Sequence, residues 1–96
     1  MKVKKCKDLS EVRKNIDKLD DKIIKLISKR SGFVKEASRF KTSESGVKDP
    51  ARVEKVLEKI KNLAVKYDMN PEIAREVYKT MIDCFINMEM GEFRNK

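Results

Sequence analysis

Four basic side chains are spaced so that they can converge on an anionic ligand. Arg30 and Lys41 are eleven residues apart, so on one continuous helix they would lie on nearly the same side. Arg13 is rotated by roughly a quarter turn from both and cannot easily join them within its own chain. Arg52 follows a polar segment and is the fourth candidate. Several cations that converge in an apolar cleft would bind a small molecule with more than one carboxylate.

Arg30 is distinguished from the other basic residues by its position in an apolar heptad pattern. Any one of the others is more simply explained as a solvated surface residue, because the chain contains 24 lysines and arginines. An unpaired buried cation costs on the order of several kcal/mol, so Arg30 needs a negative partner from another helix, another chain or a ligand. The pattern, whose members we call the seam, steps by three and four through Leu9, Val12, Ile16, Leu19, Ile23, Leu26, Arg30, Phe33, Ala37 and Phe40.

Glu89 is an acidic residue within an apolar series near the end of the chain. It lies four residues after Phe85 and seven after Ile82, which places all three on one face of a helix. Desolvation in these surroundings favours the neutral acid, whereas a nearby cation favours the carboxylate. Glu89 is therefore either a buried counter-ion or a hydrogen-bonding group at a reacting ligand.

The groups that most enzymes use for nucleophilic or metal-assisted catalysis are absent from the sequence. The chain has no histidine, and Cys6 and Cys84 are far apart without metal-ligand spacing. It also has no glycine-rich phosphate loop. We therefore expect no cofactor and no metal, and an enzyme of this kind would act by binding, orientation and electrostatics. Unimolecular pericyclic rearrangements of anionic substrates fit that description.

Three helices and two connections are predicted to position these residues. Asp8 and Glu11 resemble a capping box, and Asp49 and Asn70 each stand directly before a proline, which is a typical helix start. The predicted elements are a long helix at about 9–41, a loop at 42–48, and helices at about 50–67 and 71–93.

The unequal helix lengths predict an oligomer. The 96 residues form one all-α domain, 1–96, and its first helix is longer than the other two, so one chain cannot cover the whole seam. Two chains with antiparallel long helices would cover it, which favours an intertwined helical homodimer. Arg13 of one chain would then approach Arg30 and Lys41 of the other. The alternative is a monomeric three-helix bundle with a frayed long helix.

Charge and hydropathy narrow the class of protein further. The net charge of +8 favours anionic partners, whether nucleic acid, membrane surface or a small acidic substrate. No apolar run reaches the length of a membrane span, and the first eight residues lack the apolar stretch of a signal peptide. Together with two cysteines read as reduced thiols, these features predict a soluble cytoplasmic protein.

The candidate residues resemble the active-site pattern of the all-helical, type II chorismate mutases. The resemblance covers roughly residues 8–94 and rests on Arg13, Arg30, Lys41, Asp49, Arg52 and an acid or amide at position 89. It implies an intertwined dimer with two equivalent sites, each receiving Arg13 from the second protomer. It further implies that Arg30 binds a substrate carboxylate, that Lys41 contacts a carboxylate and the ether oxygen, and that Glu89 hydrogen-bonds this oxygen. We add Phe85 to the substrate-binding set.

Two branches of that family are both candidates. The segment from Phe33 to Glu44 is especially similar to the isochorismate-pyruvate lyase branch, which makes salicylate. Val53 stands where typical mutases carry a glutamate that holds the ring hydroxyl. Glu89 stands where glutamine is usual in many bacterial members, although some fungal mutases have glutamate.

The first interpretation is a chorismate mutase, which converts chorismate to prephenate by a Claisen rearrangement in aromatic amino-acid biosynthesis. The second is an isochorismate-pyruvate lyase that uses the same cationic site. A third, of another class, is a basic helical nucleic-acid-binding protein. Against this third interpretation, the sequence has no recognition-helix signature, and its candidate cations do not form one exposed basic face.

Overall fold

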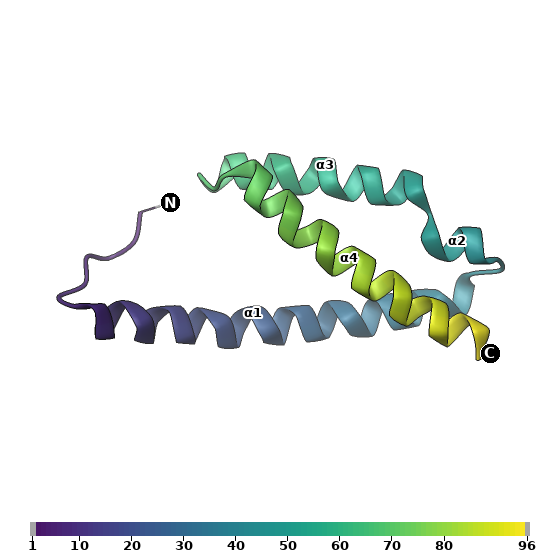
Figure 1. The fold of residues 1–96 in the computed structure, drawn as a ribbon, viewed down its shortest axis with the longest axis horizontal. Coiled ribbons are helices and arrows are strands. Elements are labelled where there is room, and N and C mark those ends of the chain that lie inside the picture. Colours follow the sequence, from purple (N-terminus) through teal and green to yellow (C-terminus); the bar gives the residue numbers. More distant parts are fainter. Residues whose placement is uncertain (1, 96) are drawn as a thin grey trace. The chain divides into compact units, whose positions relative to one another are not determined.

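The computed structural model describes residues 2–95, and α-helices dominate it (Figure 1). No residue from 2 to 95 belongs to a β-strand, in agreement with the predicted all-α class. The described residues fall into two compact units, an N-terminal unit of Lys2–Phe33 and a C-terminal unit that begins at Val34. In chain order the elements are α1 (Leu9–Ala37), the 3-10 helix η1 (Ser38–Phe40), α2 (Glu44–Lys48), α3 (Pro50–Lys66) and α4 (Pro71–Arg94). None of these helices combines the length and apolar character that a membrane crossing requires.

Helix α1 begins where the capping residues predict. The Asp8 Oδ1 atom accepts a hydrogen bond of 2.8 Å from the backbone N–H of Glu11. The Glu11 Oε2 atom in turn accepts one of 3.1 Å from the backbone N–H of Lys7. Each side chain thus satisfies a backbone donor at the helix start, where no carbonyl of the preceding turn is available.

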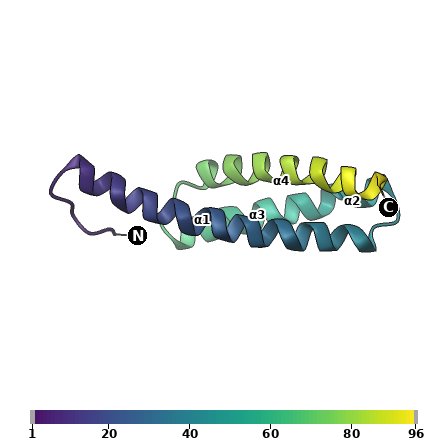
Figure 2. The same ribbon diagram turned by 90° about the horizontal axis from the view of Figure 1, so that it is seen from below.

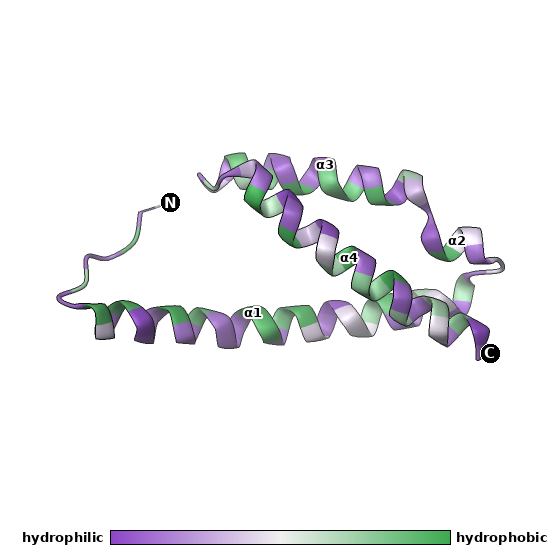
Figure 3. Cartoon of the chain, in the orientation of Figure 1, coloured by the Kyte–Doolittle hydropathy of each residue, from purple (hydrophilic) through white to green (hydrophobic). Residues whose placement is uncertain are grey.

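The seam of α1 remains largely exposed to solvent. None of the residues from Leu9 to Ala37 is buried, and Leu19 and Leu26 are 54% and 63% exposed. Figure 2 shows α1 as one continuous helix, and Figure 3 shows apolar and polar residues alternating along it. A stripe of large apolar side chains at heptad spacing is typical of a helix that packs against another helix.

The core of the C-terminal unit lies where α3 packs against α4 (Figure 1). The two helices run antiparallel, joined by the short connection at 67–70. Leu57 of α3 is only 2% exposed, and Ala64 and Ala74 are small residues at buried positions of the two helices. Leu57 and Ala64 are the buried residues of α3, and they lie seven positions apart on one face of this helix. The buried apolar residues of the unit are Val47, Leu57, Ala64, Ala74, Ile82 and Met90.

The region after α1 differs from the predicted helix at 9–41 and loop at 42–48. The α-helix ends at Ala37 and continues as η1, where the Ser38 hydroxyl donates a hydrogen bond of 2.6 Å to the Lys35 carbonyl oxygen. Within the predicted loop, residues 44–48 form the one-turn helix α2. Ser43 caps this helix by accepting a hydrogen bond of 3.1 Å from the Gly46 N–H.

Helices α3 and α4 begin at the predicted caps. Asp49 ends α2 and starts α3 in a left-handed conformation with φ of 35°, which aspartate tolerates better than most residues. Its Oδ1 atom accepts a hydrogen bond of 3.2 Å from the Arg52 N–H. Asn70 plays the same part for α4, accepting a hydrogen bond of 2.9 Å from the Glu72 N–H.

Candidate active site

Lys41 and Glu89 form the centre of the candidate site in the C-terminal unit. The Lys41 Nζ atom lies 3.5 Å from Glu89 Oε1, and the side chains of the two residues are 25% and 7% exposed. Lys41 directly follows η1, whereas Glu89 lies near the end of α4, and η1 packs against α4. The structure thus brings together Lys41 and Glu89, the two residues that the family resemblance places at the ether oxygen.

The Gly46 carbonyl is a second partner of Lys41 that no sequence pattern predicts. It accepts a hydrogen bond of 3.0 Å from Lys41 Nζ. This carbonyl belongs to α2, so the ammonium group connects α2 with the Glu89 carboxyl group on α4. A backbone acceptor leaves no side-chain signature, because every residue has a carbonyl.

Glu89 presents a buried oxygen that is open to a further hydrogen bond. Among residues 2–95, Oε1 accepts no hydrogen bond, although it lies at ion-pair distance from Lys41. A buried polar oxygen normally has a hydrogen-bonding partner, and its exceptions tend to occur at functional sites. The ammonium group of Lys41 donates hydrogen bonds, and a protonated Glu89 would donate another. The pair is therefore suited to an oxygen atom of a bound anionic molecule.

Asp49 and Arg52 have structural roles at the start of α3. The Asp49 carboxylate caps the helix by accepting a hydrogen bond from the Arg52 backbone, and the Arg52 side chain is exposed. Asp49 directly follows α2, and Arg52 lies in the first turn of α3, six residues after Gly46. Their predicted contacts with a substrate stay predictions.

The remaining candidates lie on α1 and α4. Arg13 and Arg30 belong to the N-terminal unit, where Arg13 is exposed and Arg30 is half-buried. Phe85 is half-buried on α4, one helical turn before Glu89. Their assigned binding roles stay predictions. Within residues 2–95, no three cysteine, aspartate or glutamate side chains are grouped as they would be to hold a metal ion.

An ion pair between α2 and α4 was not predicted. Arg94 Nε donates a hydrogen bond of 2.9 Å to Glu44 Oε1. This hydrogen bond, and then the positive charge of Arg94, hold the pKa of the Glu44 carboxyl below its usual value, and the charge of Lys48 contributes less. The two residues are separated by 50 positions, and both are exposed, so no spacing rule could have paired them.

Known proteins resemble this chain over most of its length. Residues 12–90 match the family model described as chorismate mutase type II. A chorismate mutase of Methanocaldococcus jannaschii is 29% identical over 76 residues, which cover 78% of this chain and 77% of that protein. An isochorismate pyruvate lyase of Pseudomonas aeruginosa is 28% identical over 89 residues, which cover 93% of this chain and 88% of that protein. Lys41 and Glu89 both lie inside the matched region.

Proposed function

This chain belongs to the type II chorismate mutase family, and from that membership we propose that it converts chorismate to prephenate. The reaction is a unimolecular rearrangement in which the ether C–O bond breaks while a new C–C bond forms. No proton, electron or water molecule is consumed. Catalysis then consists of holding a dianionic substrate in a reactive conformation and stabilising the charge that develops at its ether oxygen.

The observation that carries this proposal is the pair formed by the half-buried Lys41 and the buried Glu89. As the ether bond breaks, negative charge develops on the ether oxygen, and a preorganised cationic donor lowers the energy of that state. Lys41 is held by the Gly46 carbonyl and by Glu89, so little reorganisation is needed when the charge appears. Glu89 would add a second hydrogen bond to the ether oxygen only while it carries a proton, since a carboxylate would repel the developing charge.

The substrate carboxylates require further cations, and we assign Arg30 and Arg13 to them. A guanidinium group binds a carboxylate through two parallel hydrogen bonds, which fixes orientation as well as charge. We propose that Arg13 is supplied by a second copy of the chain. The exposed seam of α1 supports a homodimer, because a second α1 at the same heptad spacing would cover it.

A second candidate function is isochorismate-pyruvate lyase activity at the same site. In that reaction the ether bond breaks, a ring hydrogen passes to the departing side chain, and salicylate and pyruvate result. Two observations favour it. The lyase relative covers more of this chain than the mutase relative does, and Val53 offers no polar atom to a ring hydroxyl at its position on α3.

The decisive experiment is an assay of the purified protein with each substrate separately. Prephenate formation from chorismate would support the first function, and salicylate formation from isochorismate would support the second. We expect Arg30→Ala and Lys41→Ala to lower kcat/KM by at least about a hundredfold, because each removes a charged partner of the substrate.

The matched control is Lys25→Ala, which removes a cation from an exposed position of α1 outside the seam. It should retain wild-type turnover, and circular dichroism should show that all three variants remain helical. A helical Arg30→Ala protein with wild-type turnover would contradict the proposed site. Lack of turnover of both substrates by the wild type would contradict the proposed function itself.

A further inference from the structure

The exposed ion pair between Arg94 and Glu44 joins two elements that the candidate site depends on. Glu44 is the first residue of α2 and Arg94 is the last residue of α4, and their side chains meet at 2.9 Å. Both side chains are more than half exposed, so the contact contributes little to the buried core. We therefore consider what the contact does for the position of α2.

Helix α2 has few other means of keeping its place. It contains only five residues, and a helix of this length is not stable by itself. Val47 is its one buried residue, and α2 packs against α4. The buried Val47 restrains α2 at one position, and the contact at Glu44 adds a restraint at the other end of this short helix.

The position of α2 determines the environment of Lys41. The Gly46 carbonyl, two residues after Glu44, accepts the hydrogen bond from Lys41 Nζ. The same ammonium group lies 3.5 Å from Glu89 on α4, so a shift of α2 relative to α4 would move Lys41 away from this carboxyl group. A glutamate with an ordinary pKa is already charged at neutral pH, and the lowered pKa of Glu44 keeps the ion pair formed at more acidic pH as well.

We propose that Arg94 and Glu44 are positioning residues that hold α2 against α4 and thereby fix the Gly46 carbonyl and the Lys41 ammonium group. This inference rests on the proposed catalytic role of Lys41. Neither residue touches the substrate. Loss of the ion pair lowers turnover because Lys41 is displaced from the geometry in which it stabilises the transition state.

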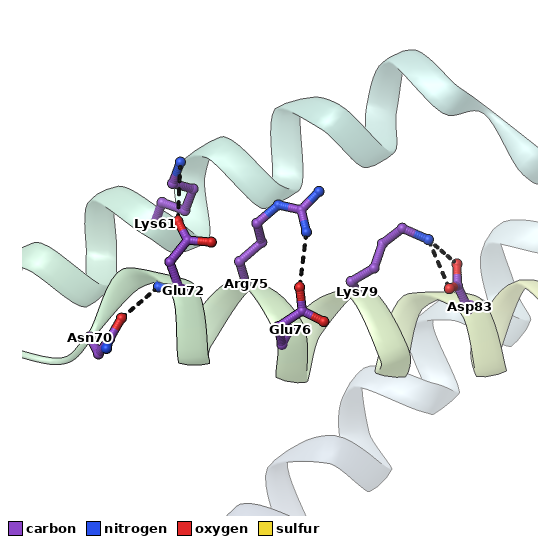
Figure 4. A network of polar contacts seen from close by, with 7 residues as sticks. All are labelled: Lys61, Asn70, Glu72, Arg75, Glu76, Lys79 and Asp83. Carbon is purple, nitrogen blue, oxygen red and sulfur yellow. Dashed lines mark hydrogen bonds and ion pairs between the residues drawn. The ribbon is translucent and has the colours of Figure 1, made fainter.

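The test compares Arg94→Gln, Glu44→Gln and the double variant with a matched control. The control is Glu72→Gln, which breaks another exposed ion pair, the 3.8 Å contact between Lys61 of α3 and Glu72 of α4 (Figure 4). We expect each single variant to lower kcat by about two- to fivefold, the range that an exposed ion pair can account for. The double variant should lose no more than either single variant, because the two residues act as one unit.

Three further measurements separate positioning from a general loss of stability. Arg94→Lys should recover at least half of the lost kcat, and the exchanged pair Glu44→Arg with Arg94→Glu should recover part of it. Amide hydrogen exchange across residues 42–49 should rise in Arg94→Gln but stay unchanged in Glu72→Gln. The melting temperatures of Arg94→Gln and Glu72→Gln should agree to within about two degrees, since each variant loses one exposed ion pair.

Two outcomes would overturn the inference: wild-type kcat in Arg94→Gln, or additive losses in the double variant. If the wild type converts neither substrate, the proposed function fails instead, and hydrogen exchange alone decides whether the ion pair holds α2. Unchanged exchange across 42–49 in Arg94→Gln would then reject it.

Discussion

Helices α3 and α1 have similar apolar patterns, but α3 contains buried residues and α1 contains none. In α3 the apolar face is covered by α4, so that Leu57 is almost fully buried. In α1 the seam is longer and equally regular, yet none of its residues is buried. An amphipathic pattern therefore predicts that a helix packs against a partner, but it does not predict whether the partner belongs to the same chain. We infer that α3 finds its partner within the chain and that α1 finds it in a second copy.

The largest effect is expected when the seam itself is disrupted. Leu19→Glu places a charge in the centre of the proposed α1 interface, where it would be buried without a partner. We expect the variant to elute as a monomer in size-exclusion chromatography with light scattering, and to lose at least about a hundredfold in kcat/KM, because each site would lack the second chain's Arg13.

The control for this prediction is Ile24→Glu, the same kind of change outside the seam of α1. Ile24 is 65% exposed and lies on another side of the helix, so a charge there should be tolerated. If Leu19→Glu remained dimeric and active, the seam would not be the interface. If neither wild type nor variant were dimeric, the comparison between α1 and α3 would need another explanation.

The second prediction concerns the partner that α3 finds within the chain. Leu57→Ala should lower the free energy of unfolding by about 2–5 kcal/mol, because it removes a buried side chain and leaves a cavity between α3 and α4. Urea denaturation measures this loss. Val65→Ala is the control, since Val65 is on the same helix but 67% exposed, and should cost less than about 1 kcal/mol. Equal losses in the two variants would contradict the packing described here.

The third prediction tests whether each site combines residues from two chains. Arg13→Ala and Lys41→Ala proteins should each be inactive alone. When they are unfolded together and refolded, random pairing makes half of the dimers mixed, and each mixed dimer has one intact site. We therefore expect up to about a quarter of the wild-type activity. Verified mixed dimers without activity would show that Arg13 does not act across the interface.

The fourth and smallest effect is expected at Glu89. If its protonated form donates a hydrogen bond to the ether oxygen, turnover should fall as the pH rises and the acid loses its proton. Glu89→Gln supplies a permanent donor of nearly the same shape. We expect this variant to have a flatter pH profile and equal or higher activity at pH 7–8, measured as kcat against pH for the two proteins side by side.

Two results would show that Glu89 has another role. A wild type with no loss of turnover at alkaline pH would mean that its proton is not needed. An inactive but folded Glu89→Gln protein would mean that the negative charge itself is required, most simply as a counter-ion for Lys41, which lies 3.5 Å away.

The sequence alone was sufficient to predict the all-helical class and the first residues of most helices. Asp8, Asp49 and Asn70 all cap the helices that they were predicted to begin, because a cap depends on neighbours within three residues. The family was equally accessible, since its pattern is a set of residue types at fixed spacings. The match over residues 12–90 confirms it.

The contacts of the candidate site were decided only by the tertiary structure. That Lys41 meets Glu89, 48 positions away, depends on how η1 and α4 pack, which no local spacing specifies. The Gly46 carbonyl and the Arg94–Glu44 pair were missed for the same reason, since a backbone oxygen and two exposed charges carry no sequence signal. Local hydrogen bonds are encoded by neighbouring residues, whereas contacts between elements, such as the one between Lys41 and Glu89, depend on how the elements pack against one another.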